Sequence, residues 1–183
     1  MNSCLKIIKV ENHWTREEKL KCCGYGEWLD ESDLFEFEYL DYRARVIRIL
    51  TREPFATEEA YFGGHLCGYV RIPESHPFFR KKDIDLDCHG GVTFNEANEE
   101  HWVGFDCGHL EDKVPTMEHI RKTNPELKKI IEKMLTLFPK YDFFKTKYRN
   151  IDYCIENCII MINELIRCDL FCTYTQKNFI QTQ

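Results

Sequence analysis

The chain has 183 residues, which is enough for one domain with its own hydrophobic core and short for two. Hydrophobic residues make up 43% and charged residues 31%, a globular balance that excludes disordered, collagen-like and coiled-coil classes. With 25 basic and 31 acidic residues the formal net charge is −6, which argues against a surface that coats nucleic acid.

The N-terminal third predicts a short helix followed by antiparallel strands. Thr15 and Glu18 have the spacing of a capping box and Gly24 stops the helix, so residues 1–24 are expected to form an N-terminal helical segment. Residues 34–39 alternate apolar and acidic side chains, which is typical of a strand with one wet face. Further strands are expected at residues 43–50, 65–72, 87–94 and 101–106.

Helical periodicity replaces this alternation in the C-terminal third. Pro125 after Asn124 is typical of a helix start, and a second amphipathic helix is predicted over residues 148–167. Its apolar stripe includes Cys154 and Cys158, which are interpreted as core residues because a free cysteine behaves as a small hydrophobe.

The predicted fold is a single α+β domain over residues 1–183, in which an antiparallel sheet of about five strands is packed by C-terminal amphipathic helices. Residues 173–183 are expected to form a polar, flexible tail. The start of the chain lacks a signal peptide, and the longest wholly apolar run, residues 158–162, is far too short to span a membrane. We therefore predict a cytoplasmic protein whose ten cysteines are mostly reduced.

One cluster near the middle of the chain carries most of the chemistry that the sequence offers. Two glycine-rich chain reversals, residues 88–91 and 104–112, are expected at the ends of adjacent strands. The candidate catalytic residues there are His89, Asp106, His109 and Asp112. In a hydrolase, His89 acts as the base, oriented by Asp106 or Asp112, and His109 is the acid or a metal ligand. The alternative is structural: the glycines shape a bulge and the polar side chains cap tight turns.

A zinc site is the other metal hypothesis. Cys67, Cys88 and Cys107 lie on neighbouring predicted strands, and imidazoles stand close to them in the sequence. The spacing matches no standard metal motif, so no cofactor is predicted, and a divalent metal remains an alternative.

Carboxylates concentrate in the first third of the chain, where aromatic residues lie among them. Such a face can compete for a basic groove that normally holds nucleic acid, whereas the alternative is a solvated sheet face. The candidate partner-binding residues are Glu27, Trp28, Asp30, Glu31, Glu36 and Glu38.

Several short motifs occur in a distinctive order between residues 24 and 165. They are GxWxDExD at 26–33, GHxCGYV at 64–70, HP at 76–77, HGGVTF at 89–94, WxGFDCxHxxD at 102–112 and YR at 148–149. In these motifs the chain resembles a family of small proteins common in bacteriophages, prophages and actinobacterial genomes. The resemblance brings no catalytic residue with it.

What the resemblance implies is a protein carried by a mobile element that acts in the cytoplasm of a bacterial host. Small phage accessory proteins often inhibit host defence systems, including CRISPR nucleases, or sequester defence signals. The first functional hypothesis is therefore a binding protein that antagonises a host defence factor by engaging a host protein, including a nucleic-acid-binding effector. The alternative is a metal-dependent or acid–base hydrolase that uses the His/Asp cluster.

Overall fold

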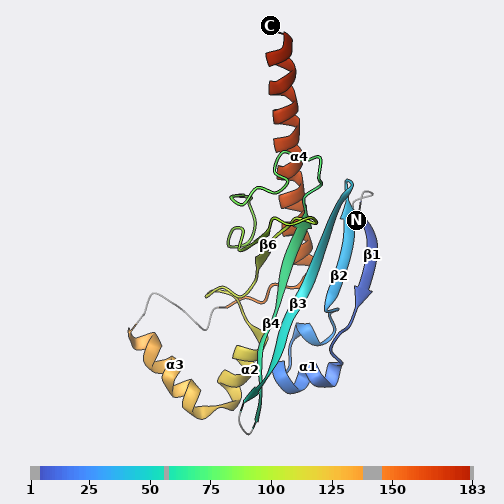
Figure 1. The fold of residues 1–183 in the computed structure, drawn as a ribbon. Helices are drawn as coiled ribbons and strands as arrows, with labels where there is room; N and C mark the ends of the chain where they lie inside the picture. Colours follow the sequence, from blue (N-terminus) through green and yellow to red (C-terminus); the bar gives the residue numbers. More distant parts are fainter. Residues whose placement is uncertain (1–4, 56–57, 138–145, 182–183) are drawn as a thin grey trace.

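The structure, a computed structural model, describes residues 5–55, 58–137 and 146–181 (Figure 1). It is built on a six-stranded antiparallel sheet in the order β1-β2-β3-β4-β6-β5. The strands are β1 (Leu5–Glu11), β2 (Leu34–Tyr39), β3 (Tyr42–Phe55), β4 (Glu58–Arg71), β5 (Phe94–Glu96) and β6 (Trp102–Asp106). The helices are α1 (Arg16–Cys23), the 3-10 helix η1 (Glu27–Leu29), α2 (Pro115–Thr123), α3 (Pro125–Leu137) and α4 (Ile151–Gln181). The predicted α+β class is confirmed.

Strand β2 follows directly from its sequence pattern. Its bounds are the predicted ones, and Phe37 and Tyr39 are buried while Glu36 and Glu38, which alternate with them, lie on the other face. A two-residue turn joins β2 to β3, with φ of 50° at Leu40 and 66° at Asp41. Positive φ at both central residues matches the twist of the two strands that the turn connects, and so sets their register.

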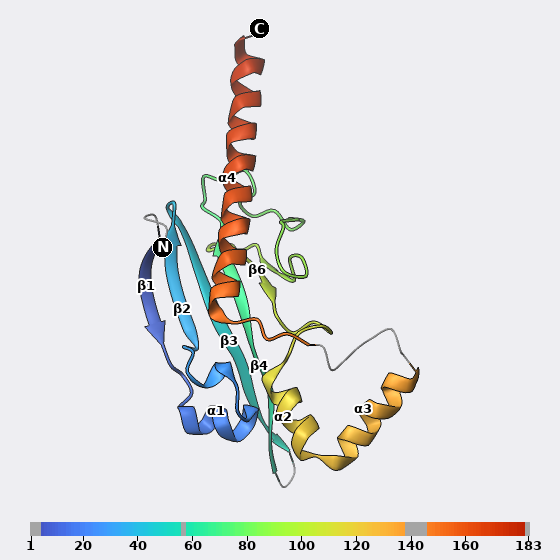
Figure 2. The ribbon, with the colours of Figure 1, turned by 180° about the vertical axis from the view of Figure 1, so that it is seen from behind.

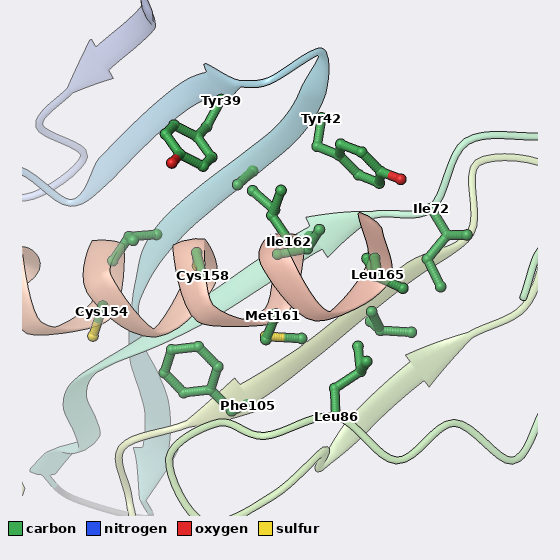
Figure 3. Packing of buried hydrophobic residues seen from close by; sticks show 14 of the residues in the cluster. Tyr39, Tyr42, Ile72, Leu86, Phe105, Cys154, Cys158, Met161, Ile162 and Leu165 are labelled. Atoms are coloured by element: carbon green, nitrogen blue, oxygen red, sulfur yellow. The ribbon is translucent and has the colours of Figure 1, made fainter. Parts of the chain in front are cut away.

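The core lies between the sheet and α4. Figure 3 shows the inner side of α4 among side chains of the sheet, including Tyr39 of β2, Tyr42 of β3 and Phe105 of β6, and Figure 1 and Figure 2 show the helix running along the sheet and then past its end. Cys154, Cys158, Met161, Ile162 and Leu165 are all fully buried. The interpretation of the two cysteines as core residues is confirmed. Helix α3 lies to the side, beyond α2, and does not cover the sheet (Figures 1 and 2).

The segment predicted as N-terminal helix divides into a strand and a helix. The capping box of α1 is confirmed, because the Glu18 amide donates to the Thr15 hydroxyl and the Glu18 carboxylate accepts from the Thr15 amide. Residues 5–11 instead form β1, an edge strand of the sheet, while residues 1–4 lie outside the described part. Most of β1 is exposed, so it lacks the apolar alternation that identifies a half-buried strand.

Two other predicted elements differ from the structure. Of the strand predicted at 87–94 only the last residue is in a strand, because Gly90 and Gly91, with φ of 68° and 81°, form a turn that the Gly91 amide closes by donating to the Cys88 carbonyl. Helix α4 continues to Gln181, through most of the predicted tail, since no glycine or proline interrupts residues 151–181. Within the described residues, no helix combines the length and the apolar composition needed to cross a membrane.

Candidate functional site

The site forms where the glycine turn at 88–91, the loop after β6 and the start of α4 meet. His89 lies in a turn closed by the Gly91 amide, which donates to the Cys88 carbonyl. Asp112 forms an isolated parallel bridge with Lys147, and this pairing brings the chain that precedes α4 beside the loop after β6. The two glycine-rich reversals are therefore close together, as the sequence predicts.

His89 is held at both ring nitrogens. Its Nε2 lies 2.7 Å from Asp112 Oδ2, and its Nδ1 lies 2.9 Å from the Tyr153 hydroxyl. Because an ionised carboxylate can only accept, Nε2 donates to Asp112 and Nδ1 accepts from Tyr153 in the neutral imidazole. The ring is mostly buried and also packs edge-on against the rings of His109 and Tyr153.

Asp112 is the most connected group of the site. Its Oδ1 accepts from Arg149 Nε at 2.9 Å, and its Oδ2 accepts from the His109 backbone amide at 3.1 Å as well as from His89. The carboxylate is 1% exposed. Burial by itself raises the pKa of Asp112, but the hydrogen bonds from His89 and Arg149 outweigh it and lower that pKa below its ordinary value. A buried, ionised carboxylate therefore faces two imidazoles.

His109 is the more exposed imidazole, at 35%, and it lies between two carboxylates. Its Nδ1 is 3.4 Å from Asp112 Oδ2 without the geometry of a hydrogen bond, and its Nε2 is 3.9 Å from Asp106 Oδ2. Gly90 presses against the same ring, since a Cβ on Gly90 would stand 2.2 Å from it. His109 Nδ1 is thus a buried polar atom with no hydrogen-bond partner among the described residues.

His89, His109 and Asp112 together can hold a metal ion. One ligand atom from each residue lies within 4.8 Å of the other two, and in the described residues no other set of three histidine, cysteine or acidic side chains does so. Two imidazoles and one carboxylate form a ligand set that several catalytic metal centres use. The contacts of Arg149 with Asp112 and of Tyr153 with His89 are the outer-shell bonds that orient such ligands.

A cavity of about 340 Å³ opens beside this group. His109 and Asp112 line it together with the apolar side chains of Leu110, Val114 and Met117. The cavity continues along α2 to Arg121. The candidate metal ligands therefore have a space next to them that a small molecule can enter.

The other predicted site residues have different positions. Asp106 is near His109 but outside the three-ligand group, and its Oδ1 accepts from the Gly108 amide at 2.9 Å. Asp106 thus has the turn-capping role that the structural alternative predicts, and Asp112 combines that role with the contacts to His89 and Arg149.

The alternative of a zinc site on three cysteines finds no support in the described residues. Among the described residues, Cys67, Cys88 and Cys107 do not form a three-ligand group. Burial raises the pKa of Cys67 and of Cys88 to about 12, so neither is an activated thiolate in the metal-free protein. Each of these thiols is a free cysteine that contributes to packing.

The predicted acidic face does not form as one surface. Trp28 is 4% exposed and donates from Nε1 to the Gly24 carbonyl, and the Glu31 carboxylate accepts from Arg48 and Tyr148 inside the protein. These two residues are not available to a partner. Glu36 is paired with Arg43 across the β2–β3 ladder, and Glu38 stands opposite the same arginine.

The remaining two residues of that prediction, Glu27 and Asp30, are exposed. Asp30 forms an ion pair with Arg16 at 3.2 Å, with both side chains more than half exposed. Glu27 is the first residue of η1 and Asp30 is its C-cap, so neither belongs to strand β2, which carries Glu36 and Glu38.

Two residues of the site were not assigned to it from the sequence. Arg149 belongs to the YR motif at 148–149 and Tyr153 lies in the first turn of α4, both far along the chain from Asp112. The signal available for Arg149 was its place in a motif, and Tyr153 had none, because it lies in the predicted helix without a motif of its own.

Comparison of the chain with protein-family models, with curated proteins and with solved structures found no match in any of the three. The resemblance to the phage and actinobacterial family stays a prediction, and the candidate site rests on its own geometry.

Proposed function

We propose that this protein is a divalent-metal-dependent hydrolase in which His89, His109 and Asp112 bind the metal ion. The observation that supports the proposal is the convergence of three ligand atoms within 4.8 Å beside an open cavity. A divalent ion at such a site polarises a substrate oxygen or activates a water molecule, which is the basis of metal-assisted hydrolysis. The residues around the ligands fit this role, since Arg149 and Tyr153 fix Asp112 and His89.

A metal-binding role accounts for the arrangement of these residues better than a role for His89 alone as an acid–base catalyst. Both ring nitrogens of His89 have partners, and a metal ion held between Nε2 and Asp112 Oδ2 would replace the hydrogen bond that joins these two atoms, with Nδ1 still bonded to the Tyr153 hydroxyl. His109 Nδ1, in contrast, is buried without a hydrogen-bond partner, and a bound cation would satisfy it. Asp106, whose Oδ2 lies 3.9 Å from His109 Nε2, is a carboxylate beside the ligand set but outside it.

Elemental analysis and zinc titration calorimetry on the full chain test the metal site. We expect about one equivalent of a divalent metal, and zinc affinity lowered more than about 100-fold in His89→Ala and in Asp112→Asn. His13→Ala is the matched control, because that imidazole is exposed and bonds only to Glu11 among the described partners, while the backbone amide that donates to Asp33 is kept. Folded wild-type protein that takes up no zinc, manganese or iron would contradict the proposal.

A hydrolytic activity requires a separate measurement. The metal-loaded protein is screened with 4-nitrophenyl phosphate, bis(4-nitrophenyl) phosphate, 4-nitrophenyl acetate and a 4-nitroanilide. We expect turnover of at least one of them by the wild type and by His13→Ala, and none by Asp112→Asn. Equal rates in the wild type and Asp112→Asn would place the hydrolysis outside this site.

Antagonism of a host defence factor in the bacterial cytoplasm stays a second prediction. The exposed carboxylates Glu27 and Asp30 are the part of the acidic surface that supports it. A plaque assay with Asp112→Asn and with the double variant Glu27→Gln/Asp30→Asn separates the two functions. An antagonist that binds through its acidic side chains loses its effect only in the double variant, whereas an enzyme loses it only in Asp112→Asn.

A further inference from the structure

The cavity beside the metal ligands points to a class of substrate. We propose that it binds a small anion, a phosphate or a carboxylate, whose charged group coordinates the metal and whose apolar body lies against α2. This inference rests on the proposed metal site and extends it from the ion to the ligand. It is carried by the lining of the cavity and by the charges around it.

The cavity has a polar end, at the proposed metal ligands, and an apolar wall. His109 and Asp112, two of the three proposed metal ligands, line the polar end. Leu110, Val114 and Met117 supply the apolar wall, and about half of the surface of Leu110 and of Met117 is exposed to solvent. Covering that surface with an apolar group removes it from water, which contributes favourable binding free energy.

Helix α2 holds this wall in a fixed position. The Thr116 hydroxyl donates to the Gly63 carbonyl at 2.9 Å, and Pro115 and Thr116 are buried. Because Thr116 is anchored to β4, the next residue, Met117, projects from a fixed first turn of the helix. Arg121 follows Met117 by four residues and therefore shares its face, which explains why both line the cavity. A pre-formed wall needs little ordering when a ligand binds.

The charges around the cavity favour an anion once the metal is present. Arg149 already balances the Asp112 carboxylate, so the charge of a divalent ion is only partly neutralised by its ligands. Lys113 and Arg121 add two positive charges to the lining, and Glu118, which is paired with Arg121 at 2.6 Å, adds one negative charge. The loaded cavity thus carries an excess of positive charge next to an apolar wall.

Its volume sets the size of the ligand. About 340 Å³ is at the lower end of the range of small-molecule sites. A phosphate or a carboxylate with one aromatic ring fits this space, whereas a polymer must leave most of its length outside. The proposed ligands are therefore low-molecular-weight esters or acids.

Calorimetry on the zinc-loaded full chain tests the inference with two pairs of probes. Phenylphosphonate is compared with methylphosphonate, and benzoate with acetate, so that each pair differs only in its apolar body. We expect the ring to tighten binding about tenfold in at least one pair. The pair with the higher affinity identifies the charged group as phosphate-like or carboxylate-like.

Two variants locate the effect. In Met117→Gln the advantage of the ring is expected to fall to about twofold or less, while zinc affinity and methylphosphonate affinity stay unchanged. Ile130→Gln, an equally exposed apolar residue on α3 outside the cavity lining, is the matched control and keeps the full advantage. Because both side chains are half exposed, neither substitution removes a core contact.

The outcomes distinguish this inference from the proposed function. If zinc binds but the ring gives no advantage in either pair, or if Met117→Gln keeps the advantage, the ligand class is wrong and the metal site stands. If zinc does not bind, both proposals fail together. A ring advantage that Met117→Gln removes and Ile130→Gln retains supports the inference.

Discussion

Gly90 and Gly91 illustrate how one residue controls the site. Both have positive φ, 68° and 81°, so a side chain at either position strains the backbone. Only Gly90 is also crowded, because a Cβ there would approach the His109 ring to 2.2 Å, whereas nothing lies within 4 Å of one on Gly91. A difference between the effects of alanine substitutions at the two glycines therefore reflects the displacement of His109.

We predict that Gly90→Ala displaces His109 and lowers zinc affinity about tenfold or more, while Gly91→Ala leaves zinc affinity within about twofold of the wild type. Both variants are expected to lose about 1 kcal/mol of unfolding free energy, since each places a Cβ at positive φ. Zinc calorimetry and urea denaturation measure the two effects. Equal zinc affinities in the two variants would show that His109 does not need its present position.

Part of the site could be predicted from the sequence, residue by residue. The spacing of His89, His109 and Asp112 beside glycine turns was sufficient to place them together, because short loops at neighbouring strand ends meet. The sequence did not distinguish Asp106 from Asp112 as the partner of His89, since the tertiary contacts with His89 and Arg149 are what select Asp112. Likewise, no local sequence pattern shows whether Trp28 is buried, as it is in the structure, or faces a partner.

Strands and helices that bury one face could be predicted from the sequence, whereas the exposed strand β1 could not. Strand β2 buries every second residue, and α4 buries residues spaced three or four apart on one face. Both periodicities are therefore visible in the sequence. Strand β1 is an exposed edge with Lys6 and Lys9 along it, and charged edges protect a sheet from unwanted pairing while hiding its strand pattern.

Helix α4 offers a test of the core within one element. Leu165 is fully buried against the sheet, whereas Ile160 is 44% exposed on the same helix. Leu165→Ala is expected to lower the free energy of unfolding by about 2–5 kcal/mol, because it leaves a cavity in the core. Ile160→Ala, the control, is expected to change it by no more than about 1 kcal/mol. Urea denaturation measures both, and similar losses would mean that α4 does not pack on the sheet as described.

At the scale of the whole molecule, a buried ionic network joins α1, β3 and the start of α4. Asp33 accepts from Arg48 Nε and from Lys19 Nζ, each at 2.8 Å, and all three side chains are almost completely buried. Arg48 also donates to Glu31 and to the Tyr148 hydroxyl, while Glu31 accepts from the first backbone amide of α4. These residues are widely separated in the sequence, so charge pairing of this kind could not be predicted from spacing.

The network makes stability depend on pH in a defined direction. Burial raises the pKa of Asp33, but hydrogen bonds from Lys19, the Trp14 amide and Arg48 outweigh it, so the pKa in the folded protein lies below its ordinary value of about 3.9. As the pH falls through that value, the unfolded chain takes up the proton before the folded protein does. The stabilisation from Asp33 is therefore complete above about pH 4 and is lost progressively below it.

Asp33→Asn tests this assignment against Asp30→Asn, a control on an exposed carboxylate that is 77% accessible. At pH 7, Asp33→Asn is expected to lower the free energy of unfolding by about 3–5 kcal/mol, because it leaves Lys19 and Arg48 buried without their shared counter-charge. Asp30→Asn is expected to cost less than about 1 kcal/mol. Between pH 5 and pH 3 the stability of Asp33→Asn should fall less steeply than that of the wild type, measured by urea denaturation at each pH. A variant whose stability falls as steeply as that of the wild type would mean that other carboxylates, such as Asp112, carry the acid sensitivity.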